Sequence, residues 1–391
     1  MAATGKSVKK IKSFCAVTFG GVVAYQYIYY KKDFSGYYEN VLQPLSQYLN
    51  PEVAHKIGVA AIKYGFFPPE KLKDPQVLKT KLLDYNLNNP IGIAAGFDKH
   101  GDAVIGLQKL GFSIVEVGSV TPEAQPGNPK PRVFRLPEDN AVINRYGFNS
   151  EGHEKVYKKI KNIKGSLLGE GLLGINLGKN KLSDPVKDYV LGIKKFSNVA
   201  DYFVINISSP NTPGLRSLQK KEELEQLLIE INKTRDSISV EKKPPLLLKL
   251  APDLSSEELK EIVSVVSKQE CRVDGLIISN TTIDRSELNN ITYRNEEGGL
   301  SGKPLTNRTT EMIKTTYKMT KGKIPIIGVG GVFSGQDAYE KILAGASAVQ
   351  IYTALIYHGP PVVSKIKTEL AELLTKDGYN NVNEAVGKGI R

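Results

Sequence analysis

Cysteine and histidine are scarce in this chain of 391 residues, and the scarcity excludes several kinds of site. The two cysteines, Cys15 and Cys271, are too few and too far apart to build a disulfide framework or an iron–sulfur cluster. None of the four histidines is spaced from another as metal ligands usually are. We therefore expect no zinc, non-haem iron or other metal centre.

Acidic residues are missing from the first 32 residues, which contain six lysines and carry a charge of +6. The rest of the chain carries the other half of the net charge of +12, and a moderately basic body suits an anionic substrate or cofactor. The sequence also lacks a clustered stripe of Arg and Lys with interleaved aromatic residues, so we expect no nucleic-acid partner.

The basic N-terminal segment surrounds one uncharged run, Ser13 to Tyr30. Its 18 residues would form a helix of about 27 Å, close to the hydrocarbon thickness of a bilayer. Tyrosines at its end are typical of a membrane interface, and the lack of acids is typical of a mitochondrial targeting segment. We predict that residues 1–32 are a targeting segment and transmembrane anchor. The alternatives are a frayed tail and a secretory signal peptide, although no small-residue cleavage site follows the run.

Residues 33–83 contain two helical patterns separated by a turn at Asn50-Pro51. Apolar residues recur at helical spacing from Tyr38 to Leu49 and again from Ala54 to Ile62. We predict an αα-hairpin with one continuous apolar face. That face could pack on the rest of the protein or, directly after an anchor, form the entrance for a lipid-soluble molecule.

Short apolar runs rich in β-branched residues alternate with helical patterns through residues 84–391. Such runs are typical of strands buried on both faces of a parallel sheet, and eight strand–helix units predict an α/β fold, the (β/α)8 TIM barrel. An open doubly wound sheet is the alternative, and its usual six strands fit less well. The predicted strands are Pro90–Gly96, Ser113–Ser119, Leu172–Gly178, Tyr202–Ser208, Pro245–Ala251, Gly275–Asn280, Ile324–Gly331 and Ala348–Thr353.

Most of these runs end in glycine, amide or hydroxyl residues, and the chemistry of such barrels takes place at the carboxyl ends of their strands. Gly330 and Gly331, after the seventh strand, would let the backbone approach a phosphate closely, although a tight turn alone could explain them. Further hydrogen-bond donors to a phosphate are expected at Tyr352-Thr353, where the eighth strand ends, and at Ser301-Gly302, after the sixth strand. Because no G-x-G-x-x-G follows a first strand, a mononucleotide is favoured over NAD.

Lys249 lies within the apolar run Leu246–Leu250, where a lysine is costly without an anionic partner. It could stabilise negative charge on a reduced flavin ring. Ser209 has no His or Asp beside it, so as a base it would need a relay through Thr212 or a water.

Asparagines recur at the predicted strand ends and in the loops that follow. A cyclic amide such as a pyrimidinedione presents N–H and C=O groups that asparagine side chains match, provided that the barrel brings them together. Any one of them could instead be a cap or a turn residue. The set is Asn144, Asn176, Asn206, Asn211 and Asn280.

Several long motifs, in order, resemble those of class 2 dihydroorotate dehydrogenases over roughly residues 34–375. The resemblance implies an FMN-dependent enzyme that oxidises (S)-dihydroorotate to orotate in pyrimidine biosynthesis, with ubiquinone as the final electron acceptor. It also implies a single-pass protein of the mitochondrial inner membrane, and we expect a monomer. The motifs are Asn89–His100, Gly118–Pro122, Asn144–Asn149, Asn206–Thr212, Gly298–Lys303 and Gly328–Gly331.

The resemblance assigns contacts to three ligands. The implied FMN contacts are Ala94, Ala95, Gly96, Ser119, Asn144, Asn176, Lys249, Ser279, Ser301, Gly302, Gly330, Gly331, Tyr352 and Thr353. The implied substrate contacts are Lys99, Asn144, Arg145, Tyr146, Gly147, Phe148, Asn206, Asn211, Asn280 and Thr281. The implied quinone contacts are His55, Arg135 and Tyr352, beside the helical hairpin.

Ser209 matches the catalytic base of the family, with Thr212 and Phe148 completing the catalytic set. Cytosolic class 1 relatives use cysteine at that position, and no cysteine lies near this loop, which favours class 2. A 2-hydroxy-acid oxidase is one rival, but it needs a histidine base, and only His100 lies near a strand end. An inactive, membrane-bound barrel scaffold is the other, and the intact Ser209, Lys249 and asparagine set argues against it.

Overall fold

The computed structural model describes residues 18–167, 169, 171–289 and 292–390. The chain divides into two compact units, Met1–Leu49 and Asn50–Arg391. In the first unit, residues 18–32 are helical. They are followed by α2 (Phe34–Tyr37), a π-helical segment (Tyr38–Leu42) and α3 (Gln43–Gln47). Tyr29 and Tyr37 pack edge to face across the junction at Asp33, which caps α2.

The predicted anchor, Ser13 to Tyr30, lies partly outside the described residues, because the description begins at residue 18. Within the described part of the chain, no helix has both the length and the apolar character needed to cross a membrane. Several apolar side chains of the helix at residues 18–32 are nonetheless exposed: Phe19, Val22, Val23, Tyr25, Tyr27 and Ile28.

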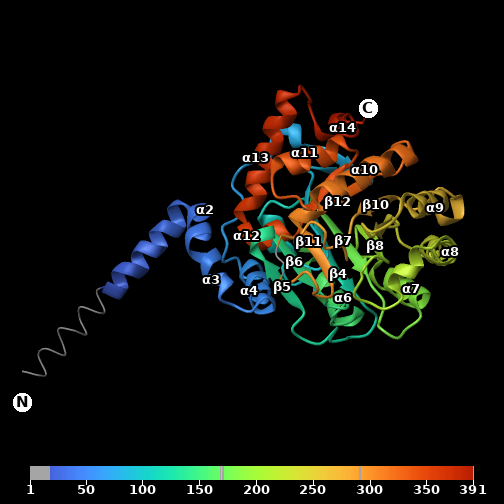
Figure 1. The fold of residues 1–391 in the computed structure, drawn as a ribbon, viewed down its shortest axis with the longest axis horizontal. Helices are drawn as coiled ribbons and strands as arrows, with labels where there is room; N and C mark the ends of the chain where they lie inside the picture. The colour runs from blue at the N-terminus through green and yellow to red at the C-terminus, as the bar shows by residue number, and fades with distance from the viewer. Residues whose placement is uncertain (1–17, 168, 170, 290–291, 391) are drawn as a thin grey trace, which may run out of the picture. The chain divides into compact units, whose positions relative to one another are not determined.

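The second unit is built on a closed barrel of eight parallel strands, which confirms the predicted fold (Figure 1). Around the barrel the strands run in the order β10-β12-β13-β3-β4-β7-β8-β9, and β9 pairs again with β10. Their bounds are β3 Ile91–Ile93, β4 Ile114–Val120, β7 Leu172–Leu177, β8 Tyr202–Asn206, β9 Leu246–Leu250, β10 Gly275–Ile278, β12 Ile326–Val329 and β13 Ala348–Ile351.

Helices surround the barrel on its outer face, as Figure 1 shows for α6 to α13. They are α5 Val104–Lys109, α6 His153–Ile163, α7 Pro185–Phe196, α8 Lys221–Ser237, α9 Ser256–Val266, α10 Thr306–Thr320, α11 Gly335–Leu343, α12 Thr353–His358 and α13 Pro361–Lys376, with the short α14 Val382–Ala385 near the C-terminus. Strands such as β7 and β9 are buried at every residue, because helices cover the outer face and side chains fill the interior.

A short hairpin that the sequence did not predict closes the amino-terminal end of the barrel. It consists of β1 (Thr80–Leu82) paired antiparallel with β2 (Tyr85–Leu87). Leu82 and Leu87 belong to the apolar cluster of the barrel interior. The hydroxyls of Thr80 and Tyr85 donate to carbonyls just before β13 and β8. This hairpin therefore plugs the end of the barrel opposite to the predicted site.

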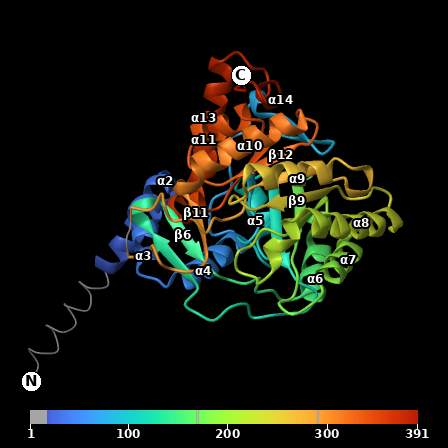
Figure 2. The same cartoon turned by 45° about the vertical axis from the view of Figure 1, so that its right-hand side comes forward.

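A second antiparallel sheet was also not predicted. Its strands are β5 (Val133–Leu136), β6 (Ala141–Asn144) and β11 (Gly299–Gly302), in the order β11-β6-β5. Figure 2 shows β6 and β11 side by side. We expected Ser301 and Gly302 in a loop, and they lie instead in β11, because the long connections after the second and sixth barrel strands pair with each other.

Both stretches of residues 33–83 with helical patterns are helical, the second as α4 (Pro51–Lys63), while their pairing as an αα-hairpin stays a prediction. Between Lys63 and residue 83 the structure has one 3-10 turn, Gln76–Leu78, followed by strand β1. Residues 50–83 belong to the same compact unit as the barrel. The bidentate contact of Arg132 with Glu52 holds α4 against the loop before β5, at 2.9 and 3.1 Å.

Candidate active site

Asparagine and serine side chains at and after the strand ends form two hydrogen-bonded groups, one around Asn206 and one made by Asn211 and Asn144. The amide nitrogen of Asn206, the last residue of β8, donates to Ser119 Oγ at 2.8 Å and to Asn176 Oδ1 at 3.2 Å. Asn280, after β10, donates to Asn206 Oδ1 at 3.3 Å. Asn211 donates to Asn144 Oδ1 at 3.4 Å. The barrel therefore brings all five predicted asparagines to its carboxyl end.

The loop after β8 holds Ser209 in a largely buried position. Ser209 Oγ accepts a hydrogen bond from the backbone N–H of Asn211 at 3.2 Å. Thr212 is also buried, and its hydroxyl has no hydrogen-bond partner. A buried hydroxyl without a partner is costly, so this oxygen is available to a substrate, a water or a relay.

Arg216 ties this loop to the substrate-side loop after β10. Its guanidinium donates to the carbonyls of Ser208 at 3.0 Å and Thr281 at 2.9 Å, and it pairs with Asp253 at 2.7 Å. The sequence analysis did not single out Arg216. An arginine five residues after a Ser-Ser-Pro-Asn turn gives no signal of its own until the partner carbonyls are placed.

Lys249 is buried, and its anionic partner is Glu116, with 3.9 Å between Nζ and Oε1. Burial lowers the pKa of Lys249, and the nearby Glu116 carboxylate opposes that shift. Glu116 is fully buried and also accepts hydrogen bonds from Asn176 at 2.8 Å and Gln350 at 2.7 Å. The sequence analysis missed Glu116, although an acid inside the apolar run of β4 is the same signal that identified Lys249.

The Gly330-Gly331 turn after β12 packs directly on the start of α10. Both glycines have positive φ, 118° and 72°. A Cβ on Gly331 would lie 2.5 Å from the backbone nitrogen of Thr306, so no larger residue fits there. Thr353, at the start of α12, donates to Ser301 of β11 at 3.0 Å. The predicted phosphate contacts from three connections therefore lie at one end of the barrel.

Lys99 and Tyr146 lie together on the predicted substrate side, with Lys99 Nζ 4.2 Å from the centre of the Tyr146 ring. Burial, helped by the charge of Arg132, lowers the pKa of Lys99 to about 8. Arg145 is engaged elsewhere in this structure, since its guanidinium pairs with Glu296 and lies over the Phe134 ring. Phe148 has a positive φ of 53°, and its ring lies beside Gly178 at the end of β7.

The other predicted contacts follow barrel strands or, for Gly147, strand β6. Ala94 and Ala95 continue β3, and Tyr352 hydrogen-bonds the carbonyl of Gly96 at 3.2 Å. Ser279 follows β10 and donates to the carbonyl of Asn280 at 2.9 Å. Gly147 lies against Asn128, which leaves no space for a side chain at that position.

His55 of α4, a predicted quinone contact, lies next to two residues that follow barrel strands, Phe97 and Tyr352. Its Nε2 lies 2.7 Å from the carbonyl of Phe97, so Nε2 carries the proton and donates it. Its Nδ1 is then an acceptor, 3.4 Å from the hydroxyl of Tyr352. Burial lowers the pKa of His55 to about 4, so the ring is neutral at physiological pH. Arg135, the third predicted quinone contact, lies on β5, and burial lowers its pKa.

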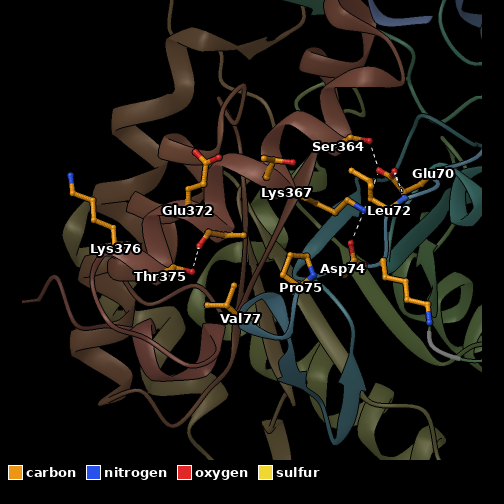
Figure 3. A pocket seen from close by; sticks show the side chains of 13 residues that line it. Glu70, Leu72, Asp74, Pro75, Val77, Ser364, Lys367, Glu372, Thr375 and Lys376 are labelled. Carbon is orange, nitrogen blue, oxygen red and sulfur yellow. Dashed lines mark hydrogen bonds and ion pairs between the residues drawn. The ribbon is translucent and has the colours of Figure 1, made fainter. Parts of the chain in front are cut away.

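A surface cavity of about 720 Å³ lies away from these residues, between the segment Glu70–Val77 and α13 (Figure 3). Its wall includes Lys367, whose Nζ pairs with Asp74 at 2.7 Å and Glu70 at 3.4 Å. None of the predicted site residues lines it. Within the part of the chain that the structure describes, no group of three or more His, Cys, Asp or Glu side chains could hold a metal ion.

A closed α/β barrel with converging amides, a buried lysine and a glycine turn at its carboxyl end defines a class of protein, the α/β-barrel enzymes. Within that class, residues 77–374 match the family model described as dihydroorotate dehydrogenase. The chain belongs to the dihydroorotate dehydrogenase family, and its relatives are of the quinone-dependent class 2.

The chain is similar to proteins named dihydroorotate dehydrogenase (quinone) along most of its length. It is 51% identical to the mitochondrial protein of Mus musculus, covering 94% of each chain. It is 46% identical to the protein of Parvibaculum lavamentivorans, covering 89% of this chain and 97% of that one. The crystal structure of DHODH from Eimeria tenella in complex with ferulenol has a TM-score of 0.84 and 39% identity, covering 87% of this chain and 96% of that one.

Proposed function

We propose that this protein oxidises dihydroorotate to orotate on a bound flavin mononucleotide and passes the electrons to ubiquinone, in pyrimidine biosynthesis. The observation that carries the proposal is that five asparagines gather at the carboxyl end of the barrel in two hydrogen-bonded groups, with Ser209 and Lys249 beside them. The asparagines are Asn144, Asn176, Asn206, Asn211 and Asn280. Such a set offers both donors and acceptors to a cyclic amide.

The residues present fit a flavin mononucleotide. The Gly330-Gly331 turn, with both residues at positive φ, packs closely on the first turn of α10, and backbone N–H groups at such a turn and helix end can hold a phosphate. Lys249 is a buried cation that can favour negative charge on the ring, and Ser119, Asn176 and Ser279 add hydrogen-bonding groups. When bound, the flavin supplies the acceptor for the hydride that leaves C6 of dihydroorotate.

Ser209 serves as the base that takes the proton from C5 of dihydroorotate. Its oxygen accepts from Asn211 N–H, which stabilises negative charge on that oxygen as its own proton leaves. The buried hydroxyl of Thr212, which lacks a partner, can pass that proton on directly or through a water. Lys99 binds the substrate carboxylate. The asparagines hold the dihydroorotate ring close to the orientation in which it reacts.

The quinone site lies at α4. His55 and Tyr352 contact each other, and the Tyr352 hydroxyl also reaches the carbonyl of Gly96, a predicted flavin contact. Val53 and Ile57, on the outer side of α4, are about half exposed, at 47% and 52%. An exposed apolar helix face that leads to a neutral histidine suits an uncharged, lipid-soluble acceptor.

The N-terminal segment anchors the protein in the mitochondrial inner membrane as a single span. Two observations support this: residues 1–32 carry no acid, and the helix at residues 18–32 exposes several apolar side chains. The second unit, as a monomer, then carries the whole catalytic site.

The proposal is tested by adding dihydroorotate to the purified, full-length protein and following quinone-analogue reduction, with fumarate and NAD as competing acceptors. Quinone reduction with a stoichiometric flavin spectrum is expected, and chromatography of the released flavin should identify FMN. Reduction of NAD or fumarate in preference to quinone would contradict the assigned acceptor.

Stopped-flow measurements separate the two half-reactions. Replacing His55 by alanine should slow flavin reoxidation by the quinone while flavin reduction by dihydroorotate stays unchanged. Deletion of residues 1–49 should leave flavin reduction intact, because every predicted flavin and substrate contact lies in the second unit. A deletion to residue 83 is unsuitable, since it removes β1 and the Leu82 plug. Equal losses in both half-reactions for His55→Ala would contradict the quinone assignment.

A further inference from the structure

Lys341, on α11, is among the most completely buried side chains of the molecule and has no part in the reaction described above. Its ammonium group donates to the carbonyl of Thr306 at 3.1 Å and to the hydroxyls of Thr309 at 2.7 Å and Thr310 at 2.9 Å. All three acceptors are uncharged oxygens. A buried ammonium that is hydrogen-bonded but not paired with an anion is costly, so its retention needs an explanation.

The stability of α10 does not provide that explanation. Thr306, Thr309 and Thr310 lie among the first five residues of α10, a helix of 15 residues. The amino-terminal end of a helix carries partial positive charge and favours anions, so a cation there is unfavourable. Asp337, one turn away on α11, offers partial compensation. Its Oδ2 accepts from Phe333 N–H at 2.9 Å and Ser334 Oγ at 2.8 Å, and its Oδ1 lies 3.9 Å from Lys303 Nζ.

The first turn of α10 is also the surface on which the Gly330-Gly331 turn rests. The hydroxyl of Thr309 lies 3.0 Å from the carbonyl of Gly330 and 2.9 Å from that of Leu305, so its single proton can go to either. The hydroxyl of Thr306 lies 2.9 Å from the carbonyl of Gly331. A chain of hydrogen bonds therefore runs from Lys341 through Thr309 to the glycine turn.

We propose that Lys341 is a positioning residue for the cofactor phosphate: it fixes the first turn of α10 against the Gly330-Gly331 turn and provides a buried positive charge behind it. The inference rests on the proposed function, in which this turn holds the phosphate of FMN. Lys341 and the amino-terminal end of α10 both carry positive charge. A phosphate bound on the other side of the Gly330-Gly331 turn would balance that charge. In its absence, burial lowers the pKa of Lys341 to about 7, against the opposing charges of Asp337 and Glu340.

The test compares FMN with riboflavin, which has the same ring and no phosphate. Flavin is removed reversibly from the full-length protein, and each ligand is titrated back by its fluorescence. Lys341→Met, which keeps an unbranched apolar stem, should weaken FMN binding about ten-fold or more and leave riboflavin binding unchanged, as expected for loss of one charge near the phosphate. Lys318→Met, which makes the same substitution at an exposed position near the far end of α10, is the control and should change neither affinity.

Thr309→Val is a second variant of nearly the same shape, which keeps the lysine and removes the hydroxyl that links it to the turn. It should weaken FMN binding by a smaller factor, about three-fold, again without effect on riboflavin. Equal weakening of both ligands in Lys341→Met, or no weakening of FMN in either variant, would overturn the role of Lys341. If the unmodified protein bound riboflavin as tightly as FMN, the proposed phosphate site itself would be wrong, which is a different outcome.

Discussion

The two ends of the barrel are made from the same strands and differ in almost every other respect. At the amino-terminal end, the β1–β2 hairpin inserts Leu82 and Leu87 into an apolar interior. At the carboxyl end, the same strands lead into glycines and into asparagines and serines whose side chains hydrogen-bond to one another. Between the two lies the buried layer of Glu116, Lys249 and Gln350.

The difference shows how the fold separates stability from chemistry. The plugged end buries apolar surface, which stabilises the barrel, and the hydroxyls of Thr80 and Tyr85 there bond to backbone carbonyls. At the open end, the polar side chains are largely buried because they hydrogen-bond to one another. A bound ligand can replace some of these hydrogen bonds with its own. Substitutions at the two ends should therefore affect different measurements.

The largest effect on activity is expected at the open end. Ser209→Ala should lower turnover about 10²–10⁴-fold, because a general base is lost. Flavin content and the denaturant midpoint should stay unchanged, since only one hydroxyl is removed. Ser209→Cys should retain part of the activity, because a thiolate can also accept a proton. Turnover of Ser209→Ala within about two-fold of the original would end the assignment of the base.

The largest effect on stability is expected in the layer between the ends. Glu116→Gln leaves the ammonium of Lys249 buried without its anion and disturbs the bonds from Asn176 and Gln350. We expect a loss of about 3–5 kcal/mol in the free energy of unfolding, measured by urea denaturation. The double variant Glu116→Gln with Lys249→Met should lose less than the sum of the two single losses. Strict additivity would show that the two residues do not interact.

A loss of stability without loss of activity is expected at the plugged end. Leu82 is 1% exposed, and Leu82→Ala should cost about 2–5 kcal/mol through lost burial and a new cavity. Well below the unfolding temperature, kcat for dihydroorotate should be unchanged. The exposed Leu72, which lies outside this cluster, is a suitable control for the same substitution. A fall in kcat at full flavin content would show that the two ends are coupled.

The smallest effect is a dependence on pH at the open end. The pKa of Lys99 is about 8 in the free protein, so Lys99 is a cation below that pH and becomes neutral above it. If this cation binds the substrate carboxylate, kcat/KM should fall by up to about ten-fold for each pH unit above 8. Lys99→Arg should remove the fall, because arginine stays charged. A fall that persists in Lys99→Arg would assign it to another group.

Repetition along the chain made the barrel predictable. Eight apolar runs alternate with helical patterns because strands covered on both faces are mostly apolar. Seven barrel strands lie within the runs that predicted them, and β4 extends one residue beyond its run, to Val120. The hairpin β1–β2 and the sheet of β5, β6 and β11 have no such pattern. Their strands are three or four residues long, and they form by pairing with distant or exposed segments.

For the site, the sequence by itself determined which residues are chemically unusual: Lys249 in an apolar strand, paired glycines after another, and asparagines at strand ends. Only the tertiary structure decided the partners. Glu116 and Lys249 are far apart in the chain, and they face each other because both strands contribute side chains to one barrel interior. Lys341 is a second example. A lysine in an amphipathic helix is usually expected to be exposed, and only the structure shows that Lys341 is buried against α10. Burial and partner choice depend on contacts between distant segments, which no local pattern encodes.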